Sequence, residues 1–538
     1  MVRWARSYDH GVVCVSCLVL LLALVGNGQM QPRSVPVYNS SYRAAIVEFA
    51  PRGQARQSAQ LNLQESMAAV EAYVAQAARA HVDILIFPEA VLWTWGLVAS
   101  NPREEIKSYG ETIPPVRTIP CSAPADTHLG LSVSRNASCI SKQYNITLVI
   151  NTIDVRACDT KSDPDCPADG RYQLNTDVVF EGQSGGMIMA IYHKYHLYGT
   201  YPILDRPRNP EVVSYTSIFG VKFGLFICFD IDFRHPVQDL LHDGVSHFIY
   251  STWWENSPPI FTATMFQQAF SRTFSSVLLA ANTGESYLNS GSGIFVRGTA
   301  LGVHFNATEF EQDTFIWADV PKTLHTIPDS LLESRPPPPT VLQTEVSKGV
   351  PCEYASPSLV KKGYCLSMDE DEATYELKVS RNFSCSVTAK FKNQRRKDQG
   401  DVHSYVLWGS DGEYQYNTTE SSPMVIQNCA VFHCEDMVSA HDNHTARVCA
   451  PTYNATAVFY HIDLKGTFSE TADIYGMVSV EGAQIVPNED VQLFDQNQRL
   501  VWDNKIQHQS PSAVAENSTR DARLFSAVLL AISEKLKS

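Results

Sequence analysis

Short apolar runs alternate with amphipathic stretches from Tyr42 to about Val320, and this alternation constrains the fold more than any other feature of the sequence. The run Ala44 to Ala50 (AAIVEFA) is typical of a buried strand, and Leu61 to Ala80 carries apolar residues at helical intervals. The strand pattern returns in VDILIFPEA, ITLVINTI, VVF, MIMAIY, FGLFICFD, HFIYSTWW and SVLLAAN. Strands separated by helices predict an α/β fold with ligand sites at strand ends.

The chain of 538 residues is long for one hydrophobic core, so two domains are expected. The proline run RPPPPT (Arg335 to Thr340) predicts a linker, because it can continue neither a helix nor a central strand. The segment after this run is rich in Cys, Tyr, Thr and Ser, which favours a smaller β-rich, disulfide-bonded domain. We therefore expect an α/β domain at 42–334, a β-rich domain at 341–510 and a tail at 511–538.

The two ends of the chain carry apolar segments. Arg3 and Arg6 precede an apolar stretch that is too short to span a bilayer, which predicts a signal peptide over residues 1–28 and a secreted protein. The C-terminal stretch LFSAVLLAISEKLKS ends in charges, so we expect an amphipathic helix there. The alternative is a weak lipid-anchor signal, which would attach the protein to the cell surface.

The charge of the chain and its Asn-x-Ser/Thr tripeptides limit its partners and indicate candidate modifications. Because Asp and Glu (57) outnumber Lys and Arg (42), the net charge of −15 argues against nucleic acid as a partner. Nine Asn-x-Ser/Thr sequons are candidate glycosylation sites in a secreted chain. They lie at Asn39, Asn136, Asn145, Asn306, Asn382, Asn417, Asn443, Asn454 and Asn517.

The cysteine count predicts a free thiol. Of 13 cysteines, Cys14 and Cys17 lie in the predicted signal peptide, which leaves an odd number in an oxidising compartment. Short spacings suggest local bridges from Cys121 to Cys139 and from Cys158 to Cys166. Six further disulfide candidates allow fifteen connectivities; these are Cys352, Cys365, Cys385, Cys429, Cys434 and Cys449. A zinc site from Cys429, His433, Cys434 and Cys449 is the alternative that the compartment disfavours.

Cys228 is the candidate for that thiol. It ends the apolar run GLFICFD, where a cysteine is more often an inert core residue, but a polar stretch begins at Asp230 and places it at a strand end. Glu89 follows another strand, in ILIFPEA, and an acid there is costly to bury without a role. It fits a general base, with a helix N-cap or a surface carboxylate as the alternatives. Lys194, in IYHKYHLYG, fits a cation that lowers the thiol pKa and holds an oxyanion.

In that order, Glu89, Lys194 and Cys228 resemble the Glu-Lys-Cys triad of the nitrilase superfamily, and the chain is similar to its vanin (pantetheinase) and biotinidase branch. The matching motifs are FPEA, YHK, FGLFICFDIDF, GSGI and the long string SDPDCPADGRYQLNTDVVF, with weaker similarity to about residue 475. The resemblance implies an αββα sandwich with a smaller β-rich domain and a Cys thioester mechanism. It assigns the nucleophile to Cys228, the base and acid to Glu89, and the oxyanion contacts to Lys194 and the backbone N–H of Phe229. It implies neither a metal nor an organic cofactor.

The sequence departs from the family pattern near the triad. The glutamate that usually follows the lysine is absent from LYGTYPILD, where Asp205 is a candidate substitute. Ile227 precedes the nucleophile in place of threonine, and Asp232 puts a charge where an apolar residue is expected. Trp93, Trp253 and Trp254, with Trp95 beside them, are candidates to line the substrate pocket.

The predicted function is hydrolysis of a linear amide in a small molecule, with a pantetheine-type substrate ahead of biotinyl amides. The second hypothesis, from a different class, is a secreted binding protein that keeps the fold with weakened catalysis.

Overall fold

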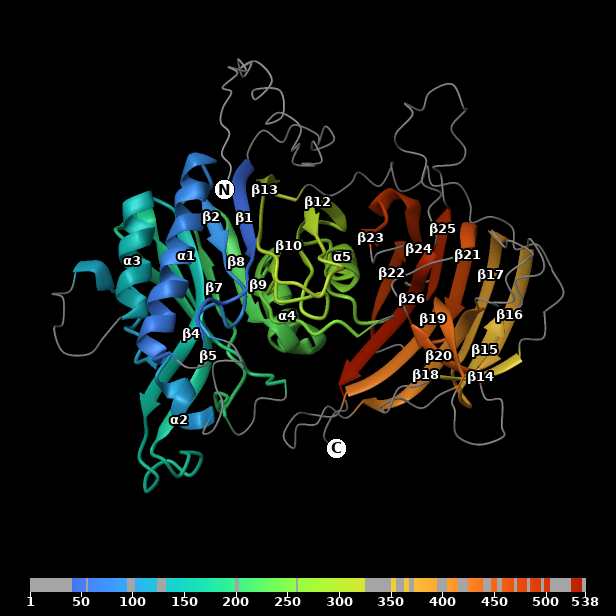
Figure 1. Cartoon of the computed structure of the whole chain (residues 1–538), viewed down its shortest axis with the longest axis horizontal. Coiled ribbons are helices and arrows are strands. Elements are labelled where there is room, and N and C mark those ends of the chain that lie inside the picture. The colour runs from blue at the N-terminus through green and yellow to red at the C-terminus, as the bar shows by residue number, and fades with distance from the viewer. Residues whose placement is uncertain are drawn as a thin grey trace, which may run out of the picture. The chain divides into compact units, whose positions relative to one another are not determined.

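Two β-sheets form the centre of the first domain in the computed structural model of the chain (Figure 1). The first has the strand order β13-β1-β2-β4-β5-β6, with β3 beside β4, and the second has the order β12-β11-β10-β9-β8-β7. The structure describes residues 41–54, 57–93, 102–122, 132–198, 203–257, 260–324, 350–354, 362–366, 372–393, 404–414, 424–438, 447–451, 457–468, 472–480, 484–494, 498–503 and 524–534. The predicted signal peptide and the proline-rich linker lie outside these residues.

The strands of the first sheet correspond to the apolar runs of the sequence. They are β1 (Ser41–Glu48), β2 (Ile84–Ile86), β3 (Gly110–Glu111), β4 (Thr147–Ala157), β5 (Arg171–Glu181), β6 (Met187–His193) and β13 (Thr314–Pro321). Those of the second sheet are β7 (Ser214–Thr216), β8 (Lys222–Ile227), β9 (His247–Ser251), β10 (Val277–Ala281), β11 (Ser292–Val296) and β12 (Thr299–His304). β1 pairs in parallel with β2, β2 with β4, β8 with β9 and β9 with β10. Parallel strands bring their carboxyl ends to one edge of a sheet, where sites form.

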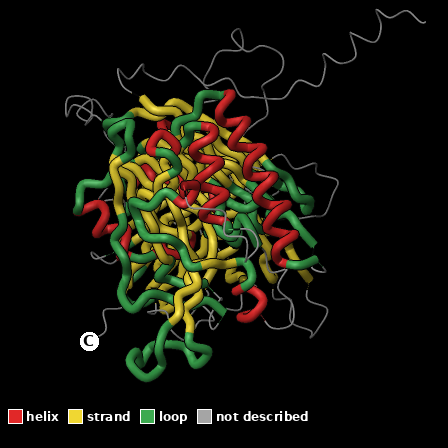
Figure 2. The backbone as a smooth tube through the Cα atoms, turned by 90° about the vertical axis from the view of Figure 1, so that its left-hand side faces the viewer, coloured by secondary structure: helices red, strands yellow, loops and turns green. Residues whose placement is uncertain are grey.

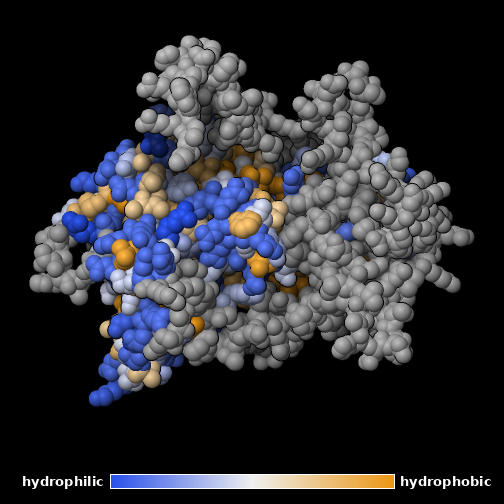
Figure 3. Space-filling view, in the orientation of Figure 1, coloured by the Kyte–Doolittle hydropathy of each residue, from blue (hydrophilic) through white to orange (hydrophobic). Residues whose placement is uncertain are grey.

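Helices cover the outer faces of both sheets. α1 (Ala59–Arg79) and α3 (Val133–Tyr144) run side by side over the first sheet (Figure 2), and α4 (Arg234–His242) and α5 (Ala263–Thr273) pack on the second. A short α2 (Pro102–Lys107) lies near β3 and β4. β1 contacts both β10 and β11, so the sheets face each other and the domain has the predicted αββα order. The visible face of this domain is mostly hydrophilic (Figure 3).

The predicted helix over Leu61 to Ala80 is confirmed as α1. Its N-cap is Ser58, whose Oγ accepts the N–H of Leu61 at 3.3 Å. Apolar residues at three- and four-residue spacing, among them Met67, Val70 and Val74, are buried against the first sheet. The helix therefore follows from its amphipathic pattern and its cap.

Two further sheets form the β-rich second domain. The larger has the order β18-β15-β14-β20-β19-β26-β22-β23 and the smaller β16-β17-β21-β25-β24. Their strands are β14 (Val350–Tyr354), β15 (Lys362–Leu366), β16 (Glu372–Lys378), β17 (Ser384–Asn393), β18 (Ser404–Tyr414), β19 (Met424–Val438), β20 (Arg447–Pro451), β21 (Ala457–Gly466), β22 (Asp473–Val480), β23 (Gln484–Ile485), β24 (Val491–Phe494), β25 (Arg499–Asp503) and β26 (Leu524–Glu534). The predicted β-rich character is confirmed.

The expected C-terminal helix is wrong. Leu524–Glu534 forms β26, which pairs antiparallel with both β19 and β22 in the larger sheet. Its central residues Ala527, Val528, Leu529 and Leu530 are all buried. A run that is apolar on both faces fits a central strand with neighbours on both sides, so the second domain extends beyond residue 510.

Candidate active site

The three candidate catalytic side chains come from carboxyl ends of strands. Cys228 follows β8, Lys194 follows β6, and Glu89 lies three residues beyond β2. All three are buried in the described structure, with 6% or less of each residue exposed. The structure therefore brings together the residues that the sequence selected, in the first domain.

Cys228 occupies a sharp turn. The chain passes from β8 directly into the 3-10 turn η5 (Cys228–Asp232), and Cys228 has a φ of 45°. A non-glycine residue in this left-handed region costs about 1–3 kcal/mol and persists only when its surroundings impose it. The carboxylate of Asp230 helps to impose it, since it accepts the N–H of Ile227 at 3.1 Å and that of His196 at 2.8 Å.

The thiol of Cys228 is free, and it contacts the peptide of Trp253. Its Sγ donates to the carbonyl oxygen of Trp253 at 3.5 Å. The hydroxyl of Tyr250 donates to the carbonyl oxygen of Cys228 at 3.1 Å, which holds the turn from β9. The nucleophile candidate is thus fixed from two neighbouring strands, β8 and β9.

The carboxylate of Glu89 accepts three hydrogen bonds in the site. Its Oε1 accepts from Nζ of Lys194 at 2.6 Å and from Nδ2 of Asn175 at 2.6 Å. Its Oε2 accepts the backbone N–H of Trp253 at 2.9 Å. The alternative role of a helix N-cap is wrong, because Glu89 is followed by a turn and its three partners come from other segments of the first domain.

The protonation of Lys194 and of the Cys228 thiol follows from burial and charge. Burial disfavours the charged form of Lys194, but the negative charges of Glu89 and of an ionised Cys228 outweigh it, so the pKa of Lys194 is raised. Burial raises the pKa of Cys228 to about 12, and the nearby Lys194 lowers it only in part. Lys194 therefore lowers the thiol pKa, as expected, but burial outweighs its effect. A thiol with this pKa holds its proton at neutral pH and needs a base to attack.

Further polar residues behind Glu89 were missed from the sequence. Asn151 donates through Nδ2 to Oδ1 of Asn175 at 2.8 Å and to Oδ1 of Asp177 at 2.9 Å. Burial raises the pKa of Asp177 to about 7, and its interaction with Glu89 adds to the rise. The signal was present, since Asn175 and Asp177 are polar residues on one face of a strand whose neighbouring residues are buried.

The three departures from the family pattern have different outcomes. Asp205 does not support Lys194: its carboxylate pairs with Arg103 at 3.0 Å and accepts the N–H of Gln173 at 2.7 Å. Ile227 is fully buried in the apolar core. Asp232 is also buried, and burial raises its pKa well above the ordinary value, so burial disfavours the charge of this carboxyl group where an apolar residue was expected.

The tryptophans divide between the site and the core. Trp93 and Trp253 meet edge to face, with ring centroids 6.1 Å apart, beside the segment that carries Glu89. Trp254 is not a pocket residue: it stacks on Phe266 at 5.3 Å and donates from Nε1 to the carbonyl of Phe261. Neighbouring side chains in an extended segment point to opposite sides, which separates Trp253 from Trp254. Trp95 and residues 199–202 lie outside the described part of the chain.

Short spacing correctly predicted two of the three described bridges, and the third is one of the pairings that the sequence left open. The bridges are Cys121–Cys139, Cys158–Cys166 and Cys385–Cys429. The zinc alternative is wrong, because the bridge to Cys385 uses one of its four ligands, Cys429. The side chains of Cys352, Cys365, Cys434 and Cys449 are not among those that the structure describes.

The four described sequons differ in accessibility. Asn145 and Asn382 are exposed, and Asn136 is partly buried. Asn306 is 2% exposed, and its Nδ2 donates to the carbonyl of Phe310 at 2.7 Å, so it is not a suitable glycan site in this fold. Asn39, Asn417, Asn443, Asn454 and Asn517 lie outside the described residues. Among the helices that are described, none is both long and apolar enough to cross a membrane.

Comparisons with known proteins connect both domains to one family. The family model described as carbon-nitrogen hydrolase matches residues 43–276, and that of the vanin C-terminal domain matches residues 363–531. A pantetheinase from Sus scrofa is 31% identical over 83% of this chain and 82% of its own length. A biotinidase from Takifugu rubripes is 36% identical over 53% of this chain and 57% of its own length. A solved nitrilase-superfamily protein from Saccharomyces cerevisiae is 17% identical, with a TM-score of 0.40. The match covers 58% of this chain and 99% of the yeast chain.

These matches confirm the resemblance inferred from the sequence motifs. The match to the Sus scrofa protein spans most of both chains, and the two family models follow the order of the two domains. The αββα arrangement of the first domain is the nitrilase-superfamily fold that the motifs implied. The chain therefore belongs to the carbon–nitrogen hydrolases of the nitrilase superfamily, in the family that contains the pantetheinases and biotinidases.

Proposed function

We propose that the protein is a secreted amidase that cleaves a linear amide of the pantetheine type through a thioester on Cys228. The observation that carries the proposal is the buried ion pair of Glu89 and Lys194 beside a free thiol in a strained turn. The backbone of Trp253 connects the ion pair to the thiol, since its N–H donates to Glu89 and its carbonyl accepts from Cys228. A nucleophile, a base and a fixed cation are the groups that acyl transfer to sulfur requires.

In the first half of the reaction, Glu89 takes the proton from Cys228 as the sulfur attacks the amide carbonyl. The raised pKa of Cys228 supports this role, because a protonated thiol is a weak nucleophile until a base removes its proton. The Nζ of Lys194 and the backbone N–H of Phe229 stabilise the oxyanion of the tetrahedral intermediate. Glu89 then gives its proton to the departing amine as the carbon–nitrogen bond breaks, and the thioester remains.

In the second half, water replaces the amine. Glu89 takes a proton from water, the hydroxide attacks the thioester carbonyl, and the carbon–sulfur bond breaks to release the carboxylic acid. The proton on Glu89 returns to the sulfur, which restores the thiol. The raised pKa of Lys194 supports a permanent cation throughout, because the residue stays charged at the pH at which the base must be ionised.

The choice of substrate rests on similarity to relatives. The relative matched over 83% of this chain is named a pantetheinase, which favours pantetheine, while the biotinidase match supports biotinyl amides as the alternative. A binding protein with weakened catalysis is disfavoured, because the three candidate catalytic residues lie together with their contacts intact. Secretion is supported by the disulfide bridges, which persist in oxidising compartments.

Mass spectrometry of the trapped acyl-enzyme tests the proposal directly. The purified protein is mixed with pantetheine or with biocytin, quenched in acid and digested, and the peptide that contains Cys228 is analysed. We expect an adduct with the mass of the acyl half of pantetheine, and no adduct in Cys228→Ala. An adduct from biocytin alone would select the alternative substrate. Hydrolysis that continues in Cys228→Ala would overturn the mechanism.

A further inference from the structure

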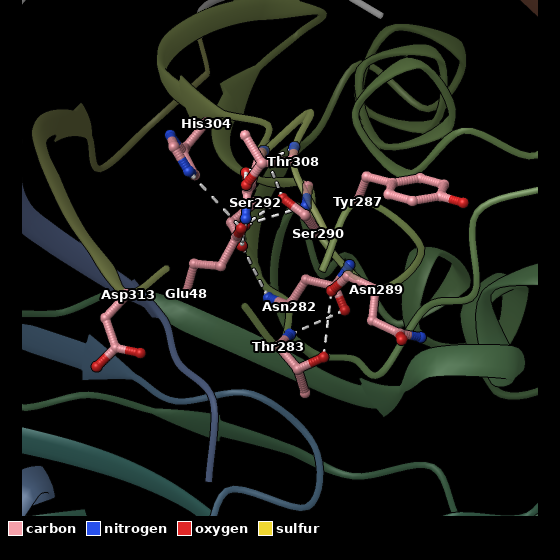
Figure 4. Close-up of polar contacts among 12 residues, drawn as sticks. Glu48, Asn282, Thr283, Tyr287, Asn289, Ser290, Ser292, His304, Thr308 and Asp313 are labelled. Carbon is pink, nitrogen blue, oxygen red and sulfur yellow. Dashed lines mark hydrogen bonds and ion pairs between the residues drawn. The ribbon is translucent and has the colours of Figure 1, made fainter. Parts of the chain in front are cut away.

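Another buried carboxyl group, that of Glu48, stands at the end of β1 and has no part in the proposed chemistry. Its residue is fully buried, and three donors converge on it (Figure 4). The Oγ of Ser290 lies 2.5 Å from Oε1, while the N–H of Gly291 and the Oγ of Ser292 lie 3.0 and 2.7 Å from Oε2. Burying a carboxyl group is costly, and three donors offset that cost only if their positions are held.

The two serine hydroxyls are oriented toward Glu48 by other contacts. The Oγ of Ser290 accepts the N–H of Asn306 at 2.6 Å, and the Oγ of Ser292 accepts the N–H of Asn282 at 2.9 Å. A hydroxyl that accepts from a backbone N–H still has its own proton to donate, and here Glu48 is the acceptor. Burial raises the pKa of Glu48 to about 8, and the serine and glycine donors oppose that rise.

From Ser292 the contacts lead to the active site. Asn282 follows β10, and its Oδ1 accepts the N–H of Trp254 at 2.9 Å. The carbonyl of Asn282 accepts the N–H of Phe49, the residue after Glu48, at 3.3 Å. Asn282 is thus tied to the end of β1 twice, once directly and once through Ser292.

The segment that Asn282 holds is the one that touches both reacting groups. The N–H of Thr252 donates to the carbonyl of Ala281 at 2.9 Å, so the peptides on either side of Trp253 are both fixed to the end of β10. Between them, the Trp253 peptide donates to Glu89 and accepts from Cys228. A shift of this segment would therefore move the base and the nucleophile together.

We propose that Glu48 is a positioning residue for catalysis, which acts through Ser292 and Asn282 to set the Trp253 peptide between Glu89 and Cys228. The inference rests on the proposed function, because it assumes that Cys228 and Glu89 react together. Glu48 touches neither of them, so its effect is expected on the rate of the chemical step. Displacement of reacting groups by about 1 Å can cost on the order of 100-fold in rate.

The matched control is Glu181, a buried carboxyl group at the end of β5. It accepts from Oγ1 of Thr147 at 2.6 Å and from the N–H of Ile218 at 3.2 Å, and none of these contacts leads to Trp253. Glu181→Gln therefore reports what the loss of a buried carboxylate in the same domain does to folding alone. Glu48→Gln keeps the shape of the side chain, and above the raised pKa of about 8 it replaces one acceptor oxygen of the ionised carboxyl group with an amide donor among the donors of Ser290, Gly291 and Ser292. The variants are therefore compared at pH 9.

The test compares Glu48→Gln, Ser292→Ala, their double variant and Glu181→Gln with the wild type. We expect Glu48→Gln and Ser292→Ala each to lower kcat about 10- to 100-fold with KM changed by less than about twofold. The double variant should be no worse than the poorer single variant, because both break one chain of contacts. Glu181→Gln should lower the melting temperature without lowering kcat. If Glu48→Gln does not fold, Ser292→Ala makes the same test.

A second readout separates this inference from the choice of substrate. The rate of alkylation of Cys228 by iodoacetamide needs no turnover, so it can be measured even if pantetheine and biocytin are not hydrolysed. We expect alkylation to slow in Glu48→Gln and Ser292→Ala and to stay at the wild-type rate in Glu181→Gln. Wild-type kcat and alkylation in a folded Glu48→Gln or Ser292→Ala would overturn the positioning role, whatever the substrate proves to be.

Discussion

The buried ion pair between Glu89 and Lys194 supports a prediction with a definite magnitude. The two charged atoms lie 2.6 Å apart, and the side chains are only 6% and 3% exposed. Removing one partner of such a pair leaves an uncompensated charge and costs about 3–5 kcal/mol. Lys194→Met removes the charge and keeps a side chain of similar shape. Because Glu89 keeps its donors from Asn175 and Trp253, we expect the lower part of this range, about 3–4 kcal/mol at pH 8.

A second substitution isolates the cause. Glu89→Gln combined with Lys194→Met removes both charges, and a neutral pair of similar volume is often as stable as the ion pair it replaces. The double variant should therefore recover most of the stability lost by Lys194→Met alone.

Denaturant unfolding of the wild type and the variants at pH 8 measures these differences. Hydrolysis should be absent from every variant, so recovered stability without recovered activity separates folding from catalysis. If Lys194→Met is as stable as the wild type at pH 8, the charge of Lys194 does not compensate the buried charge of Glu89. A double variant no more stable than Lys194→Met would refute the electrostatic explanation and point to lost packing.

Three further predictions concern single groups. Cys228→Ala should lower hydrolysis of pantetheine by more than about 1,000-fold in a product assay, because the nucleophile is lost. The melting temperature of Asp232→Asn, relative to that of the wild type, should rise as the pH goes from 5 to 9. Equal pH dependence of the two melting temperatures would contradict this prediction. The reason is that the pKa of Asp232 is raised on folding, so the folded state keeps a proton that the unfolded state loses as the pH rises. The stability contributed by Asp232 is therefore present at low pH and lost as the pH rises. Replacing Cys385 and Cys429 by alanine opens a loop of 44 residues and should cost about 4 kcal/mol in denaturant unfolding.

Local patterns in the sequence were sufficient for the helices and strands of the first domain, whereas the three central residues of its site also needed the family resemblance. α1 follows from helical spacing and a serine cap, and the strands follow from short apolar runs. Cys228 ends an apolar run, where a cysteine is more often an inert core residue, and its role, like those of Glu89 and Lys194, came from the resemblance to the Glu-Lys-Cys triad. The elements need only residues that are close in sequence, but the site needs the order of three distant motifs.

The errors arose where distant residues decide the structure. Leu524–Glu534 is apolar enough for a helix or a strand, and only its pairing with β19 and β22 makes it a strand. Trp253 and Trp254 are adjacent and alike, yet one lies beside Glu89 and the other stacks on Phe266. Asp205 was a reasonable substitute partner for Lys194, but it binds Arg103, about 100 residues earlier in the chain. Sequence spacing carries no information about such partners.

The arrangement around Trp253 indicates how this site makes a thiol with a raised pKa reactive. Burial, with a smaller contribution from Glu89, raises the pKa of Cys228 to about 12 although Lys194 opposes the rise, so the charge of Lys194 does not keep a thiolate ready at neutral pH. Activation must then come from proton transfer to a base held at the right place, and proton transfer depends steeply on position. The peptide that fixes this position is bound to Glu89, to Cys228 and, on either side, to the end of β10. Reactivity in such a site depends on the rigidity of its surroundings as much as on its charges, which is why a buried carboxyl group that never meets the substrate is expected to affect the rate.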